Sequence, residues 1–299
     1  MNRRGFIRHA GVFGAAFSMP RAIFAEARQA RQVPTRPIPS SGEPLPILGF
    51  GNSQSFRAGD YSNAKKLLDV LLEMGGSFVD TDGISQVVLG QYMGEHRAQD
   101  KLFLGTNIGA NDWQDGLDEI DRSREIQGKK VLDLLQLPRP TDIENQWRLM
   151  QGWKDSGRTR YIGIAIARDS YYDMIESLIR SGTLDFVQLN YSMLEPESGD
   201  RLLPLAQDEG VAVVTNRPFI NGEYFPLVSG KVLPAWAAEF DCHSWAQFSL
   251  KYILANPAVN CVLTETTKTE HAVDNLSAGF GRLPDEKTRM QMLRLVRSF

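Results

Sequence analysis

Residues 131–167 read VLDLLQLPRPTDIENQWRLMQGWKDSGRTRYIGIAIA and combine two hydrophobic patterns. The ends of this stretch, Val131–Leu137 and Thr159–Ala167, are short and almost continuously apolar, which is typical of parallel strands buried on both faces. Between them, Thr141–Trp153 starts with a threonine followed by acidic residues and continues with apolar residues at helical spacing. The stretch therefore predicts one strand–helix–strand unit.

The same alternation runs from Leu45 to the end of the chain. Eight units of about 30 residues fit a closed barrel. A doubly wound sheet is the alternative, but Gly49-Phe50-Gly51 is too sparse for the glycine-rich turn of that fold. We therefore expect an α/β protein with a single (β/α)8 TIM barrel over residues 45–299, covered by a C-terminal helix at Asp285–Arg297. The expected strands are Leu45–Asn52, Ser77–Thr81, Lys101–Ile108, Val131–Leu137, Thr159–Ala167, Asp185–Tyr191, Val211–Asn216 and Asn260–Glu265.

The composition excludes several classes of protein. Of the 299 residues, 42% are hydrophobic and 23% are charged, which is ordinary for a globular chain and unlike a disordered one. The net charge of −3 gives no basic excess for a nucleic-acid partner. Two cysteines cannot build a disulfide framework, and the four histidines do not cluster, so we expect no metal site. No run of 18 apolar residues predicts a stable membrane span.

The first 27 residues have the order of an export signal. Asn2–Arg8 contains a twin arginine followed by an apolar pair, Gly11–Pro20 is mildly apolar, and Ala25–Ala27 supplies small residues for cleavage. We therefore predict a twin-arginine signal peptide over residues 1–27, the Tat export machinery as a partner, and a periplasmic or otherwise exported location. A disordered basic N-terminus is the alternative. Residues 28–44 are rich in proline and serine and predict an extended linker, ordered where it lies on the barrel.

Several strand ends resemble the aldo/keto reductase family. The export signal and the segment Ser244–Gln247 are similar to its secreted, twin-arginine branch. The resemblance implies NADPH-dependent reduction of carbonyls. It also implies a tyrosine acid whose acidity is raised by a lysine paired with an aspartate, and a histidine that orients the substrate. The matching segments are Leu48–Gly51, Gly76–Thr81, Trp153–Gly163, Asp185–Ser192, Asn216–Phe219, Thr266–Lys268 and Asp274–Leu276.

Of the four residues in this catalytic tetrad, the resemblance finds only the aspartate, as Asp80. Ser85 stands at the tyrosine position, and its hydroxyl is shorter and less acidic than a phenol. Asn107 stands at the lysine position and has no charge to lower the pKa of an acid. Pro138 stands at the histidine position and has no side-chain donor. The resemblance therefore implies a degenerate tetrad.

The cofactor positions implied by the resemblance are altered as well. Ala165-Ile166 replaces a Ser-Asn pair that binds the nicotinamide carboxamide, whereas Gln188, which shares this task, is kept. Glu265 replaces the glycine of a turn that receives a phosphate, and a carboxylate beside an anion is unfavourable. We therefore expect no tightly bound cofactor, while NADP(H) binding is left open. The family's adenosine contacts are matched by Lys268, Glu270 and Asn275.

Further polar residues at strand ends outline a ligand-binding mouth. Neutral amides and one cation suit polyhydroxylated ligands or a carboxylate; alternatively, the amides satisfy loop backbone groups. Asp80, Asp82 and Glu265 could bind a cation or perform acid–base chemistry, or the last two are solvated loop charges. Tyr191, Phe219 and Trp236 are candidate platforms for a flat ring or packing residues. The polar mouth residues are Asn107, Gln136, Asn190, Asn216, Arg217 and Glu265.

These observations favour an exported aldo/keto reductase-like protein that lacks family-type NADPH-dependent carbonyl reduction. It would act as a ligand-binding or accessory pseudoenzyme, with a small molecule in the barrel mouth and a homologous reductase as a partner. Two alternatives stay open. One is an active NAD(P)H-dependent oxidoreductase with an unorthodox proton donor, such as Asp80 or a bound water. The other is a non-redox lyase or isomerase that acts on a sugar-like compound through Asp80 and Glu265.

Overall fold

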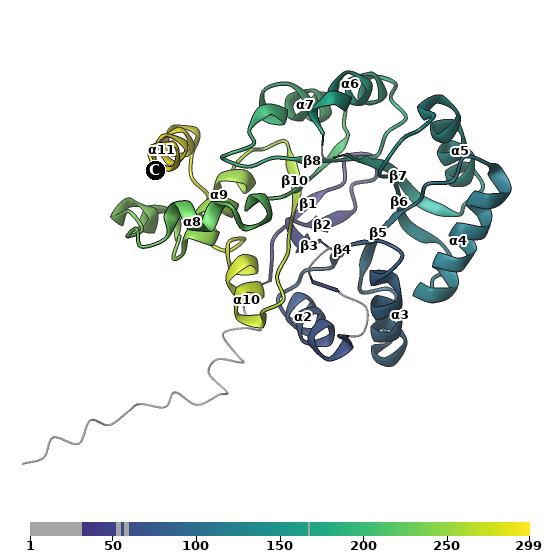
Figure 1. The fold of residues 1–299 in the computed structure, drawn as a ribbon, viewed down its shortest axis with the longest axis horizontal. Coiled ribbons are helices and arrows are strands. Elements are labelled where there is room, and N and C mark those ends of the chain that lie inside the picture. The colour runs from purple at the N-terminus through teal and green to yellow at the C-terminus, as the bar shows by residue number, and fades with distance from the viewer. Residues whose placement is uncertain (1–31, 52–54, 57–59, 167) are drawn as a thin grey trace, which may run out of the picture.

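A computed structural model describes residues 32–51, 55–56, 60–166 and 168–299, and the predicted signal over residues 1–27 lies outside this part. Eight parallel strands close into a barrel in the order β10-β3-β4-β5-β6-β7-β8-β9 (Figure 1). The expected (β/α)8 barrel is therefore confirmed. The strands are β3 (Leu48–Phe50), β4 (Phe78–Thr81), β5 (Phe103–Asn107), β6 (Leu132–Leu137), β7 (Thr159–Ala165), β8 (Phe186–Asn190), β9 (Ala212–Asn216) and β10 (Val259–Thr264).

Helices surround the barrel, and the expected C-terminal helix packs at its outside (Figure 1). Side-chain caps fix several helix starts: Asp285 accepts from the Thr288 amide at 2.8 Å. One helix begins two residues later than its pattern indicated, because Asp142 rather than Thr141 is the cap. No helix of the described residues is long and apolar enough to cross a membrane. The helices are α2 (Tyr61–Glu73), α3 (Ser85–His96), α4 (Trp113–Gln127), α5 (Ile143–Asp155), α6 (Tyr172–Arg180), α7 (Glu197–Asp208), α8 (Tyr224–Val228), α9 (Trp245–Leu254), α10 (Thr269–Ser277) and α11 (Glu286–Arg297).

Part of the proline-rich segment closes one end of the barrel. The strands β1 (Thr35–Pro37) and β2 (Pro44–Pro46) pair antiparallel in a short hairpin. Ile38 and Leu45, at 0% and 1% exposure, join the cluster of side chains inside the barrel. The hairpin therefore plugs the end that holds the N-termini of the strands, which we call the floor. The opposite end, where the strands finish, is the mouth.

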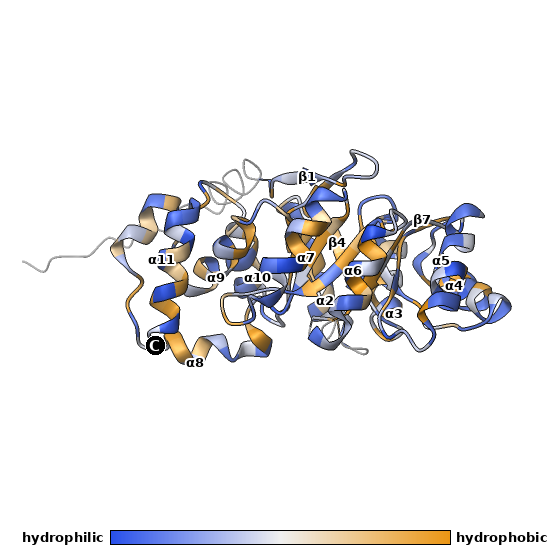
Figure 2. Cartoon of the chain, turned by 90° about the horizontal axis from the view of Figure 1, so that it is seen from above, coloured by the Kyte–Doolittle hydropathy of each residue, from blue (hydrophilic) through white to orange (hydrophobic). Residues whose placement is uncertain are grey.

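The inside of the barrel changes from apolar to polar toward the mouth. Strands are among the most hydrophobic segments of the chain (Figure 2), and the lower interior holds aromatic and aliphatic side chains such as Phe78 and Phe186. Above them the register places Asp80 beside Gly105 and Gln136 beside Gly163. A Cβ on Gly105 would lie 2.5 Å from Gln136 Oε1, so glycine makes room for a buried amide. This polar layer positions the site.

Candidate functional site

Two adjoining cavities lie at the mouth, with volumes of about 480 and 320 Å³. The inner cavity reaches Asp80 and Gln188 in the polar layer, and the outer cavity reaches Asn275 on α10. Both are lined by the same five residues at their junction, so they form one two-lobed groove. The junction residues are Phe219, Phe225, Glu265, Thr266 and His271.

Asp80 is the buried acid of the groove. Its relative exposure is 9%, and burial raises its pKa to about 7. A hydrogen bond with Gln188 opposes this shift, whereas the negative charges of Glu265 and Asp82 add to it. Gln188 in turn accepts a hydrogen bond of 2.9 Å from the Gln136 amide nitrogen. The polar layer is thus a chain of two amides that ends on a carboxyl able to hold its proton at neutral pH.

Amide oxygens near the mouth lack hydrogen-bond partners within the described part of the chain. They are Asn107 Oδ1, Gln136 Oε1 and Asn216 Oδ1, and all three atoms are buried. Leaving such an acceptor unsatisfied costs about 1–3 kcal/mol. The interpretation that these amides serve loop backbone groups therefore does not account for their oxygens. Of the three, Asn216 lines the groove, and its oxygen suits a ligand that donates hydrogen bonds.

The residues at the other three predicted tetrad positions do not line the groove. Ser85 is 1% exposed at the start of α3, where its Oγ accepts from the Asp82 amide at 2.9 Å and also contacts Asp82 Oδ1. Its hydroxyl therefore stabilises a helix terminus. Asn107 ends β5 and Pro138 follows β6, both half-buried. Of these four described residues, Asp80 is the one that lines the groove.

The structure brings together most of the other residues predicted for cofactor and ligand. Gln188, Asn216, Arg217, Glu265 and Lys268 line the inner lobe, and Asn275 lines the outer lobe. The remaining predicted residues lie outside the lining. Gln136 is buried beneath the groove, whereas Asn190 at the end of β8 and the exposed Glu270 on α10 do not line it.

Arg217 is the cation predicted at the end of β9, and a carboxylate already engages it. Its Nε and Nη2 donate to the two carboxylate oxygens of Glu195 at 3.2 and 2.9 Å. Such a fork geometry is the strong form of an arginine–carboxylate pair. The predicted carboxylate ligand would have to displace Glu195.

The loop after β9 holds unusual backbone conformations. Arg217, Ile220 and Asn221 have φ values of 54°, 47° and 52°, in the left-handed region that favours glycine. For the β-branched Ile220 this is a true outlier, and each such residue costs of order 1–3 kcal/mol. Arg217 and Asn221 line the inner lobe. Backbone strain of this kind gathers at functional sites, which agrees with the position of the groove.

Four groove residues were missed or discounted by sequence reasoning. Phe225, Trp245 and Asp274 line the groove, and His271 lies at the junction of the lobes. Phe219 and Phe225 contact each other with ring centroids 5.0 Å apart. An aromatic residue in a loop or helix carries no sequence mark that separates packing from ligand contact. The described residues contain no group of three or more His, Cys, Asp or Glu that could hold a metal ion.

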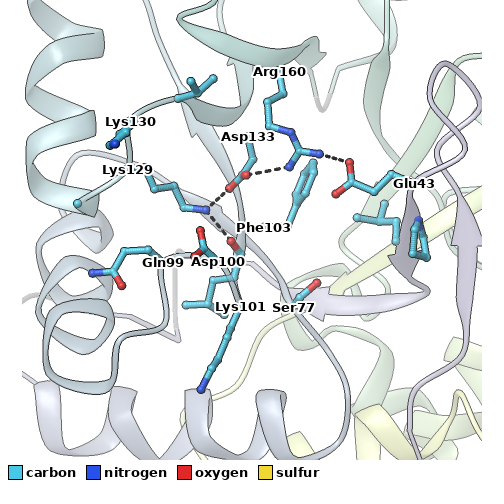
Figure 3. Close-up of a pocket in the computed structure, with 15 residues that line it drawn as sticks. Glu43, Ser77, Gln99, Asp100, Lys101, Phe103, Lys129, Lys130, Asp133 and Arg160 are labelled. Carbon is cyan, nitrogen blue, oxygen red and sulfur yellow. Dashed lines mark hydrogen bonds and ion pairs between the residues drawn. The ribbon is translucent and has the colours of Figure 1, made fainter.

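A further cavity, of about 690 Å³, lies at the floor (Figure 3). Its charged groups bind one another. Lys129 Nζ lies 2.6 Å from Asp133 Oδ2, Arg160 bridges Asp133 and Glu43, and Tyr161 donates to Glu43 at 2.7 Å. In Figure 3 the side chains of Lys101 and Lys130 point away from this network. The floor cavity is therefore a charge-compensated seam between the hairpin and the barrel, and we place the functional site at the mouth.

Comparison with known proteins is consistent across sequence and fold. The aldo/keto reductase family matches residues 47–291. An aldo-keto reductase of Gibberella moniliformis is 24% identical over 304 residues, covering 84% of this chain and 90% of that protein. The uncharacterized oxidoreductase YqkF of Bacillus subtilis is 22% identical over 266 residues, covering 74% and 83%.

Solved structures show the same barrel. The holo form of the aldo-keto reductase AKR11C1 from Bacillus halodurans superposes with a TM-score of 0.73 at 20% identity, covering 89% of this chain and 96% of that one. An aldo/keto reductase from Klebsiella pneumoniae in complex with NADP and acetate gives 0.71 at 18% identity, covering 89% and 95%. At sequence identities of 18–20%, these superpositions show a shared fold.

Proposed function

Since the chain belongs to the aldo/keto reductase family, we propose that its mouth binds a small polar ligand without the family's tetrad-based, NADPH-dependent carbonyl reduction. The observation that carries this proposal is the position of Ser85. At the place where the resemblance implies a tyrosine acid, the hydroxyl is buried in the start of α3 and bonded to Asp82. None of the described residues that line the two lobes is a tyrosine.

The charge of the groove supports the proposal. In a working tetrad the aspartate would face a lysine, which would lower its pKa. Here Asn107 occupies the lysine position, and the charges that shift the pKa of Asp80 are those of Glu265 and Asp82, which raise it. The centre of the mouth therefore lacks the electrostatics that would help an acid to release its proton to a carbonyl.

The residues present do not fit a tightly bound NADP(H). A dinucleotide carries phosphates, which need cations or backbone N–H donors beside them. Glu265 lies at the junction of the two lobes, and Asp80 and Asp274 line either side of it. Arg217 is engaged by Glu195, and Lys268 is exposed at the start of α10. The shape of the groove suits an elongated ligand, but its carboxylates oppose phosphates.

A second candidate keeps the chain an enzyme. Asp80 is protonated in part at neutral pH, because its pKa is raised to about 7, and it lies in the inner lobe. It could donate a proton in an NAD(P)H-dependent reduction that does not use a tyrosine. This candidate predicts turnover that Asp80→Asn abolishes and Ser85→Ala leaves unchanged.

The test is an assay of NADPH oxidation by the full chain with a panel of aldehydes and diketones. We expect no oxidation above that of a heat-denatured sample. Robust turnover would refute the proposal, and its response to Asp80→Asn would decide whether the second candidate explains it.

Export through the Tat machinery, a periplasmic location and a homologous reductase partner belong to the proposal as well. Fractionation of cells that express the full chain, with and without Arg3→Lys and Arg4→Lys, tests the export.

A further inference from the structure

A carboxylate lies at the junction of the two lobes, so every ligand that spans both lobes has to pass beside it. Glu265 follows β10 and lines the inner and the outer cavity. A Cβ on Gly51 would lie 2.5 Å from Glu265 Oε1, so the carboxylate rests directly against the end of β3. A ligand that passes from the barrel centre toward α10 must therefore pass Glu265.

The surroundings of Glu265 extend its charge along the groove. Asp80 lies in the inner lobe, and the field of Glu265 reaches it, since Glu265 contributes to the raised pKa of Asp80. Asp274 lines the outer lobe. Two cations line the inner lobe as well: the guanidinium of Arg217 is held bidentately by Glu195, and Lys268 is exposed. An anion in the groove would meet these carboxylates in a site that is partly shielded from water.

Independent features of the groove suit a cation that donates hydrogen bonds. Asn216, at the end of β9, lines the inner lobe, and its Oδ1 is buried and has no hydrogen-bond partner within the described part of the chain. Phe219 and Phe225 line the junction, and Trp245 lines the outer lobe. Aromatic faces attract cations, most strongly where water is partly excluded.

We propose that Glu265 determines the ligand specificity of the groove. Its carboxylate makes the groove select a small organic cation, that is, an ammonium group attached to an apolar body, and exclude anions such as phosphates. The ammonium lies in the inner lobe, where Glu265 and Asn216 Oδ1 accept its hydrogen bonds. The apolar body lies against Phe219, Phe225 and Trp245. This inference rests on the proposed function, because it assigns the ligand class of the same mouth.

Three probes on one scaffold test the inference with the full chain. Benzylammonium, benzyl alcohol and benzoate share a ring and differ in charge, and calorimetry at low salt measures their affinities. We expect benzylammonium to bind at least about tenfold more tightly than benzoate, with benzyl alcohol between them. An equal or reversed order, or no binding of any probe, would overturn the inference on the wild-type protein alone.

The variant Glu265→Gln removes the charge with little change of shape. It should weaken benzylammonium about tenfold and strengthen benzoate. Glu270→Gln is the matched control, because Glu270 is an exposed carboxylate on α10 that does not line the groove. If both variants change the affinities equally, Glu265 has no special role and the inference fails. Carbonyl-dependent NADPH oxidation is measured separately and tests the proposed function. If the three probes do not bind in the expected order but no NADPH is oxidised, this inference fails and the proposed function stands.

Discussion

The two ends of the barrel treat charge in opposite ways. At the floor, Lys129, Asp133, Arg160 and Glu43 neutralise one another in a continuous network beneath the hairpin. At the mouth, the carboxyl of Asp80 keeps a raised pKa, and several amide oxygens lack partners within the described residues. The floor therefore pairs its charges, whereas the mouth retains features that cost stability. In barrels of this class, the mouth is also where function is placed.

The sharpest test of this contrast is to remove one carboxylate charge from each end. At the floor, Asp133→Asn should destabilise the fold by about 3–5 kcal/mol, because it leaves Lys129 buried beside a neutral partner. Asp133 also accepts the Leu104 amide at 2.9 Å. Denaturant unfolding at pH 7 measures the loss. Asp121→Asn, at a side chain 56% exposed, is the control and should cost less than about 1 kcal/mol. If Asp133→Asn lowers the free energy of unfolding by less than about 1 kcal/mol, the floor does not differ from an exposed ion pair, and the comparison between the two ends fails.

At the mouth the same change should have the opposite sign. The Asp80 carboxyl ionises near its ordinary value of 3.8 in the unfolded chain and near 7 in the fold. Stability contributed by the protonated acid is therefore lost as the pH rises from 4 to 7, with an upper bound of roughly 4 kcal/mol. Asp80→Asn should stabilise the protein at pH 8 by about 2 kcal/mol and flatten this pH window. Chemical unfolding at pH 5 and pH 8 checks both; a variant less stable than wild type at pH 8 would contradict the account.

The ionisation of Asp80 should also appear in ligand binding. As the pH rises from 6 to 8, Asp80 gains negative charge, so the affinity for benzylammonium should rise about tenfold. Glu265, Arg217, Lys268 and His271 line the same lobe, so a variant of His271 serves as the control for a neighbouring side chain. Calorimetry should therefore show that Asp80→Asn abolishes the slope and that His271→Gln keeps most of it. A slope that survives in Asp80→Asn would contradict the role of Asp80.

The smallest expected effect concerns backbone strain. Asn221 is exposed, has a φ of 52° and lines the groove, whereas Arg97 has a φ of 48° at the end of α3, outside the groove. Replacing either by glycine should stabilise the fold by about 0.5–1 kcal/mol. Only Asn221→Gly should also alter the affinity for the benzyl probes. Equal probe affinities in both variants would mean that the loop after β9 plays no part in binding.

The barrel itself was accessible from sequence, because buried parallel strands leave continuous apolar runs such as Val131–Leu137 that recur at regular spacing. The hairpin at the floor was not accessible from sequence, since its prolines indicated an extended linker. The burial of Ile38 depends on strands that are distant in the chain. Among the mouth residues, Gln188 and Asn216 on neighbouring strands line the inner lobe, and their roles toward a cofactor or ligand stay predictions.

Contacts between segments distant in the chain were beyond reach of the sequence. Arg217 gave no sign of its pairing with Glu195, 22 residues earlier. Ser85 could be identified as a poor acid, but its bonds to Asp82 follow from the local turn into α3. Trp245 and Phe225 meet in one groove through the packing of α8 and α9, which no local pattern records.

The central claim is that this mouth neither holds a dinucleotide nor reduces carbonyls with it. Calorimetric titration of the full chain with NADPH tests it most directly, at low salt, where any electrostatic attraction is strongest. The account predicts no saturable heat up to about millimolar concentration, a weak limit set by carboxylates facing phosphates. Saturable micromolar binding of one NADPH per chain would contradict it.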